Sequence, residues 1–138
     1  NYVAAVKAFH TVCEEYDAQD VLYVDSDLEN RVLEGSTFSI FMVKGEQIFT
    51  PPLDGKILSS IVRKKVIEMS KGHFDLREAF ITLDQLLDAD EIFITSTTRD
   101  IKPVVRINHT QIGDGSVGAM TKRLQDFYQK TYHHVLEE

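Results

Sequence analysis

The stretch EIFITSTT, residues 91–98, decides the fold class of this chain. Its first five residues are rich in β-branched and aromatic side chains, which makes this the strongest strand prediction in the chain. Four hydroxyl residues in a row, Thr95 to Thr98, stand at the end of this strand and predict a polar turn. Such a cluster can donate hydrogen bonds to a phosphate or a carboxylate, although, taken alone, an ordinary polar turn after a strand is the simpler explanation.

Further strands are predicted around this stretch. They cover residues 21–24, 31–34, 38–43, 47–50, 74–81 and 103–107. Lys44-Gly45-Glu46 predicts a tight reversal that joins two of them into a hairpin. Pro51-Pro52 should end that hairpin, because proline cannot donate to the strand ladder. Short strands linked by hairpins disfavour a purely parallel, doubly wound sheet.

Apolar spacing and capping residues predict four helices. They cover residues 2–16, 59–71, a short segment after Thr82, and the chain from about Ser116 onward. Thr82-Leu83-Asp84-Gln85 has the pattern of a capping box, and Gly72 is a suitable helix stop. We expect Arg63-Lys64-Lys65 to form a solvated face of the second helix. Strands that alternate with capped helices predict an α/β (α+β) domain.

Length, charge and cysteine content exclude several classes of protein for this chain. A length of 138 residues with no linker predicts one domain, 1–138. A net charge of −7 disfavours nucleic acid, and no apolar run reaches the roughly 18 residues that span a membrane. The single cysteine, Cys13, excludes an intrachain disulfide and favours a reducing compartment, which we take to be cytoplasmic. We expect no metal site, because the adjacent His133 and His134 would face different ways on a helix.

Familiar catalytic motifs are absent from the sequence: there is no Walker loop, GxGxxG, GxSxG or HExxH. Two features suit an anion. One is the helix start at residues 58–63, where backbone N–H groups and the helix dipole favour a phosphate. The other is the hydroxyl cluster of residues 95–98. Glu34-Gly35-Ser36, an acid near a strand end, is a third feature that says little alone.

The order and spacing of these pieces resemble the class IV aminotransferases, the fold-type IV pyridoxal-phosphate enzymes. The matching segments are Asn1-Tyr2, Glu34-Gly35-Ser36, Thr50-Pro51-Pro52-Leu53, Ile57-Leu58, Ile61-Val62-Arg63, Ala89-Asp90-Glu91, Thr95-Ser96-Thr97-Thr98, Pro103-Val104, Ile112-Gly113-Asp114-Gly115 and Thr121-Lys122-Arg123-Leu124-Gln125. The resemblance implies the C-terminal domain of the D-amino acid aminotransferase-like fold, a mixed sheet or pseudo-barrel with flanking helices.

The resemblance also implies a role for individual residues. Cofactor contacts are expected from Tyr2, Glu34, Leu58, Ile61, Val62 and Thr97, and substrate contacts from Thr97 and Thr98. Glu34 would hold a proton on the pyridine nitrogen of pyridoxal 5'-phosphate. Ile61 and Val62 would offer backbone N–H groups to its phosphate and Thr97 its hydroxyl, with Leu58 on the ring face and Tyr2 near the phenolic oxygen.

Three departures from the family pattern stand out. Val62 replaces a threonine that is usual at the phosphate helix, and Ser39 replaces a common asparagine. The Schiff-base lysine of the family lies upstream of the position of Asn1, in a longer chain, and Lys7 does not match it. We therefore expect no catalytic residue in these 138 residues, and the N-terminal domain to be absent from them.

The expected function is that of an aminotransferase, dimeric by resemblance, acting on a branched-chain or D-amino acid and a 2-oxo acid. Two alternatives remain open. One is an aminodeoxychorismate lyase that releases pyruvate, and the other is a non-catalytic relic or dimerisation domain. The resemblance decides neither the side chain nor the stereochemistry of the substrate.

Overall fold

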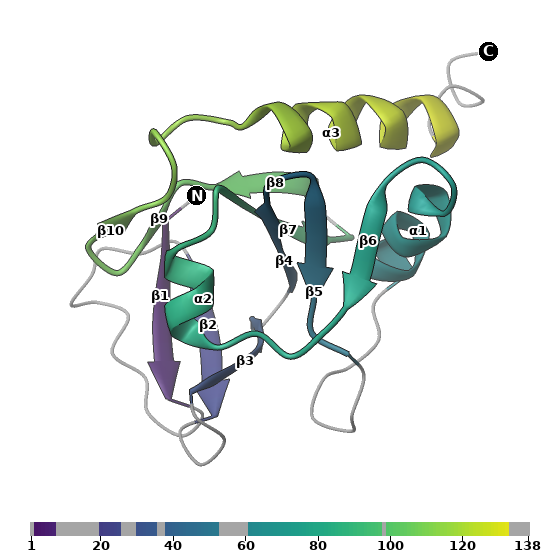
Figure 1. Cartoon of the computed structure of the whole chain (residues 1–138). Coiled ribbons are helices and arrows are strands. Elements are labelled where there is room, and N and C mark those ends of the chain that lie inside the picture. Colours follow the sequence, from purple (N-terminus) through teal and green to yellow (C-terminus); the bar gives the residue numbers. More distant parts are fainter. Residues whose placement is uncertain are drawn as a thin grey trace.

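The computed structural model describes residues 2–7, 20–25, 30–35, 38–52, 61–97 and 99–132. These residues form two five-stranded sheets and three helices (Figure 1). The first sheet, in the order β10-β9-β1-β2-β3, contains β1 (Tyr2–Lys7), β2 (Asp20–Asp25), β3 (Arg31–Gly35), β9 (Arg106–Ile107) and β10 (Thr110–Gln111). The second sheet, in the order β6-β5-β4-β7-β8, contains β4 (Ser39–Lys44), β5 (Gln47–Thr50), β6 (Asp75–Glu78), β7 (Glu91–Ser96) and β8 (Asp100–Val104). The helices are α1 (Ile61–Ser70), α2 (Leu83–Leu87) and α3 (Ala119–Tyr132).

Both sheets are mixed. β1 runs parallel to β2 and β9, and β5 runs parallel to β6, whereas the remaining pairs are antiparallel. The predicted mixed sheet with flanking helices is confirmed. In the part of the chain that the structure describes, no helix has the length and apolar character needed to cross a membrane.

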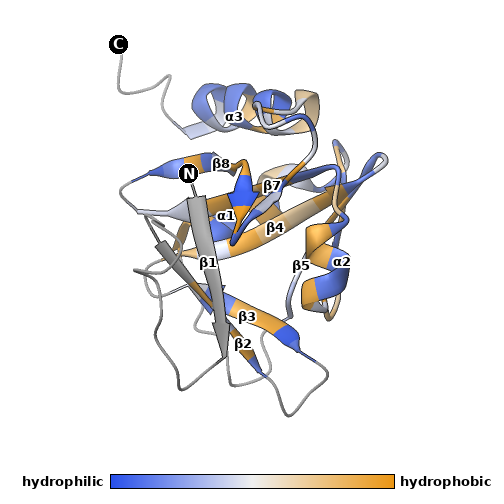
Figure 2. Cartoon of the chain, turned by 90° about the vertical axis from the view of Figure 1, so that its left-hand side faces the viewer, coloured by the Kyte–Doolittle hydropathy of each residue, from blue (hydrophilic) through white to orange (hydrophobic). Residues whose placement is uncertain are grey.

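The second sheet is buried on both faces at its centre. On β4, Ile40 and Met42 pack toward the first sheet, while Phe41 and Val43 pack toward α1 and α3. This division follows from the period of two in a strand, which sends successive side chains to opposite faces. Phe41 stacks on Phe93 of β7, with ring centroids 4.8 Å apart. In Figure 2 the hydrophobic colours gather on β3 and β4, whereas α3 is largely hydrophilic.

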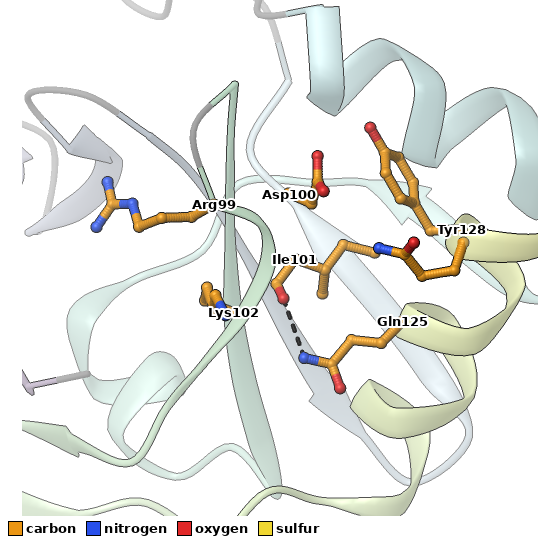
Figure 3. A pocket seen from close by; sticks show the side chains of 7 residues that line it. Arg99, Asp100, Ile101, Lys102, Gln125 and Tyr128 are labelled. Carbon is orange, nitrogen blue, oxygen red and sulfur yellow. Dashed lines mark hydrogen bonds between the residues drawn. The ribbon is translucent and has the colours of Figure 1, made fainter. Parts of the chain in front are cut away.

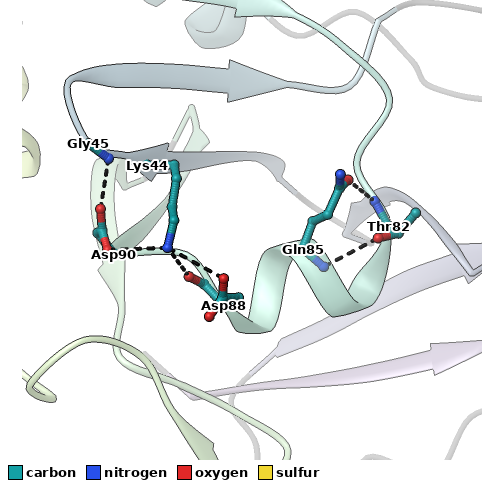
Figure 4. A network of polar contacts seen from close by, with 6 residues as sticks. All are labelled: Lys44, Gly45, Thr82, Gln85, Asp88 and Asp90. Atoms are coloured by element: carbon teal, nitrogen blue, oxygen red, sulfur yellow. Dashed lines mark hydrogen bonds and ion pairs between the residues drawn. The ribbon is translucent and has the colours of Figure 1, made fainter.

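The predicted hairpin and capping box are both confirmed (Figure 4). Gly45 adopts a φ of 63° in the turn between β4 and β5, and its N–H donates to Asp90 Oδ2 at 2.7 Å. At α2, Thr82 Oγ1 accepts from Gln85 N at 3.2 Å, and Gln85 Oε1 accepts from Thr82 N at 3.0 Å. The Gly45 contact fixes the hairpin against the start of β7, and the Thr82 and Gln85 contacts close the first turn of α2.

The start of α3 is capped from β7 rather than from its own chain neighbours. The Glu91 carboxylate accepts from Met120 N at 3.1 Å and from Thr121 N and Oγ1 at 2.8 Å each. A side chain at Gly118 would collide with Glu91, so glycine is needed at this approach. Along α3, Met120, Leu124 and Tyr128 are buried, whereas Thr131 is exposed.

Two element predictions are wrong. Residues 2–7 were expected to open a helix but form β1, because they gain parallel partners in β2 and β9, which local apolar spacing cannot reveal. Residues 8–16 of that prediction, including Cys13, lie outside the described residues. Residues 103–107 were expected to form one strand but are interrupted at Val105, where the chain passes from β8 in the second sheet to β9 in the first.

Candidate functional site

The predicted site elements meet at one edge of the second sheet. Antiparallel pairing places Ser39, the first residue of β4, opposite Thr95 near the end of β7. β5 ends where β4 begins, because the two form a hairpin, and β6 ends there as well, because it runs parallel to β5. We call this the carboxyl edge, since β5, β6 and β7 all finish at it.

Arg63 fastens the first turn of α1 to the carboxyl edge. Its Nη2 donates to Pro51 O at 2.9 Å, directly after β5, and to Glu78 Oε1 at 2.7 Å, at the end of β6. Ile61 and Val62 belong to the same turn, whose N–H groups have no acceptors within the helix. The Val62 side chain packs in the core between the sheet and the helices, so only its backbone is available to a ligand.

The prediction that Arg63-Lys64-Lys65 forms a solvated face is wrong for Arg63. Arg63 is 3% exposed, whereas Lys64 is exposed and Lys65 is half-buried. Arg63 stands three residues before Val66, on the buried side of the helix, and that spacing is the sequence feature that could have identified it. Its buried charge is balanced by Glu78 and by a backbone carbonyl.

The end of β3, which carries Glu34, lies beside the start of β4 at the carboxyl edge. Gly35 N donates to Phe38 O at 3.0 Å, and Phe38 leads directly into Ser39 of β4. A side chain at Gly35 would overlap the Phe38 ring, so the glycine lets β3 and the ring approach closely. Glu34 is half-buried at the end of β3.

The hydroxyl cluster begins within β7, at Thr95 and Ser96, and reaches Thr97 in the turn after the strand. Ser96 is buried, and its Oγ accepts from Arg99 N at 3.1 Å and from Arg99 Nε at 3.2 Å. Thr97 is exposed in this turn. Asp100 follows with a φ of 53°, a backbone conformation that side chains rarely adopt. The turn is therefore held by Ser96, a member of the predicted hydroxyl cluster, and by Arg99, which sequence reasoning did not single out.

The predicted site residues fall into three groups. Glu34, Ile61, Val62 and Thr97 lie on elements that meet at the carboxyl edge. The backbone of Tyr2 begins β1 and pairs with Arg106 of β9 in the first sheet. Leu58 and Thr98 lie outside the described residues. For the first group the structure places the elements at one edge, and a shared ligand for these residues stays a prediction.

A cavity of about 180 Å³ lies on the α3 side of the same turn (Figure 3). It is lined by Arg99, Asp100, Ile101, Lys102, Gln125, Tyr128 and Gln129. Burial raises the pKa of Tyr128 to about 12, and the nearby Asp100 carboxylate adds to the shift through its charge and a hydrogen bond. Tyr128 is thus a neutral hydrogen-bonding anchor for the turn, not an acid or base near neutral pH.

The comparisons identify the family. A family model described as amino-transferase class IV matches residues 1–107, more than half of the chain. The chain belongs to the class IV aminotransferases.

Relatives and solved structures agree with this assignment. The chain is 38% identical to branched-chain amino acid aminotransferase 2, chloroplastic, of Humulus lupulus over 129 residues, and 32% identical to D-alanine aminotransferase of Bacillus licheniformis over 132 residues. These alignments cover 90% and 94% of this chain. The Escherichia coli branched-chain amino acid aminotransferase structure superposes with a TM-score of 0.76 at 31% identity, covering 82% of this chain and 37% of that one. The fold-type IV architecture is therefore established.

The chain spans only part of the length of these relatives. It covers 31% of the Humulus lupulus protein and 47% of the Bacillus licheniformis protein. A branched-chain aminotransferase structure described as bound to pyridoxamine 5'-phosphate superposes with a TM-score of 0.82 at 24% identity, with 94% of this chain covering 50% of that one, and supports the fold alone.

Proposed function

We propose that this chain forms the cofactor-holding C-terminal part of a pyridoxal-phosphate-dependent aminotransferase. The complete protein would move an amino group between an amino acid and a 2-oxo acid. The observation that carries the proposal is that Glu34, the first turn of α1 and the turn after β7 all lie at the carboxyl edge. Membership of the class IV family supports it.

The residues at this edge match the chemical groups of the proposed cofactor. A carboxylate at Glu34 suits a protonated pyridine nitrogen, and the N–H groups of the first turn of α1 suit a phosphate. The Thr97 hydroxyl adds a further donor. When bound, pyridoxal 5'-phosphate supplies a ring that withdraws electrons from the substrate α-carbon.

Each residue has a distinct task in the proposed mechanism. Glu34 keeps a proton on the ring nitrogen, while Ile61, Val62 and Thr97 bind the phosphate and so fix the orientation of the ring. Thr97 and Thr98 are proposed to receive the substrate carboxylate. Leu58 on the ring face and Tyr2 near the phenolic oxygen complete the proposed set.

The Schiff-base lysine is proposed to come from an N-terminal domain outside these 138 residues. The partial coverage of the relatives supports this division of the protein. Lys7 lies on β1, in the first sheet. The proposal therefore assigns binding and orientation to this chain and proton transfer at the α-carbon to the missing lysine.

A borohydride experiment tests this division. The 138-residue chain, mixed with pyridoxal 5'-phosphate and reduced, should show no stoichiometric adduct at one lysine by mass spectrometry. The complete protein, treated identically, should carry one adduct upstream of Asn1. A stoichiometric adduct at Lys7 would contradict the proposed location of the chemistry.

A donor and acceptor screen of the complete protein with added cofactor tests the function. L-leucine and D-alanine should be compared as donors to 2-oxoglutarate, with pyruvate release from aminodeoxychorismate as a parallel assay. We expect amino transfer from one of the two donors at a rate well above that of the cofactor alone. Pyruvate release without transfer would identify a lyase, and inactivity in every assay would favour a non-catalytic domain.

We also propose that the complete protein is a homodimer in the cytoplasm. Resemblance to the family supports the dimer, and the single cysteine supports a reducing compartment. The Humulus lupulus relative is named chloroplastic. Light scattering of the complete protein tests the dimer, and imaging of a tagged complete protein tests its location in the cell.

A further inference from the structure

Arg99 joins two parts of the proposed site that are far apart in the sequence. On one side it holds the turn after β7, since its backbone N–H and its Nε both donate to Ser96 Oγ. Ser96 immediately precedes Thr97, the residue proposed to bind phosphate and substrate. Figure 3 shows the Arg99 side chain directed away from Gln125 and Tyr128 of α3, which line the other side of the turn.

On its other side, Arg99 contacts Phe38, which is hydrogen-bonded to the end of β3, the strand that carries Glu34. Its guanidinium carbon lies 5.6 Å from the centroid of the Phe38 ring, within the range of a cation–π contact. Phe38 is 4% exposed, accepts the hydrogen bond of Gly35 N through its carbonyl, and fills the space beside Gly35. Glu34 immediately precedes Gly35 on β3.

We infer that Arg99 is a positioning residue that couples the Glu34 end of β3 to the Ser96–Thr97 turn. The inference rests on the proposed function, in which Glu34 meets the ring nitrogen and Thr97 the phosphate of one ligand. Those two groups belong to one small molecule, so their protein partners must be held in register for both contacts to form at once. A misplacement of about 1 Å can cost up to roughly 10²-fold in rate.

The chemistry of arginine suits this task. Its guanidinium is planar, permanently charged, and able to stack on an aromatic ring while its Nε donates in the plane. A lysine keeps the charge but has no Nε donor and no flat face. Arg99→Lys should therefore retain only part of the cofactor affinity that Arg99→Met loses.

The first test measures pyridoxal 5'-phosphate affinity of the complete protein by equilibrium dialysis. Arg99→Met should weaken binding about tenfold, and Lys102→Met, an exposed charge-matched control on β8, should leave it unchanged. In the wild-type background, the changes in cofactor-binding free energy caused by Glu34→Gln and Thr97→Ala should not add up in the double variant. In the Arg99→Met background the same two changes should be additive. Unchanged affinity in Arg99→Met, or non-additivity that persists there, overturns the inference.

A second measurement does not need the cofactor. Ser96→Ala removes the acceptor of Arg99 while retaining its charge, and should raise the exchange rate of the Gly35 amide, which is hydrogen-bonded to Phe38 O. Lys102→Met should not change it. If Ser96→Ala speeds the exchange but the wild-type complete protein binds no cofactor, the proposed function alone is refuted. Normal cofactor binding with unchanged exchange would refute the coupling alone.

Discussion

Glu34→Ala in the complete protein is expected to lower the rate of amino transfer by about 10²–10³-fold, the cost of removing one charge-stabilising group from a reaction centre. The proposed task of Glu34 is to keep the ring nitrogen protonated, and alanine cannot do this. Glu34→Gln keeps the shape and removes the charge, so it should be nearly as slow. The measurement is kcat with the best donor found in the screen.

The stability of these variants should differ little from that of the wild type, because Glu34 is half-buried at a strand end. Glu46→Ala is the matched control, since Glu46 is exposed in the turn at the opposite end of β4. It should leave the rate unchanged. Turnover of Glu34→Ala at the wild-type rate would refute the pyridinium role.

Arg63→Met is expected to lower the free energy of unfolding by about 2 kcal/mol, because it removes two hydrogen bonds made by a buried charge. This loss of stability is smaller than the loss expected for a fully buried ion pair, because the Glu78 side chain is 47% exposed and water can solvate it. Urea unfolding followed by circular dichroism measures the difference.

Lys64→Met provides the control for Arg63→Met. Lys64 is the next residue on α1 and is exposed, so its replacement should change the unfolding free energy by less than about 0.5 kcal/mol. Arg63→Met should also weaken cofactor binding, because the first turn of α1 loses its attachment to β5 and β6. Equal stability of the two variants would show that the Arg63 contacts contribute little.

Local chemistry predicted much of the fold. The strand of residues 91–96, the Lys44-Gly45-Glu46 reversal and the capping box at Thr82 depend on near neighbours in the chain, and each is confirmed. Residues 2–7 depend instead on parallel partners at residues 20–24 and 106–107, and their helix prediction is wrong. Long-range pairing is the part that apolar spacing cannot supply.

The candidate site was predictable as separate pieces and not as one surface. The residues of interest could be named from their order in the chain, but only the strand register brings the ends of β3, β5 and β7 to one edge. Arg63 and Arg99 were missed as organising residues because a charged side chain near apolar ones usually points to water. Their partners become apparent only when distant carbonyls and rings are placed beside them.

The passage of the chain between the two sheets bears on how the molecule unfolds. β3 leads to β4 across Gly35 and Phe38, and β8 leads to β9 across Val105 alone. Because the connections are short, neither sheet can separate from the other without unravelling the strand ends that they join and opening the shared core that includes Val32, Ile40 and Ile107. The described residues of both sheets should therefore denature in a single cooperative transition, even though they comprise two distinct hydrogen-bonded layers.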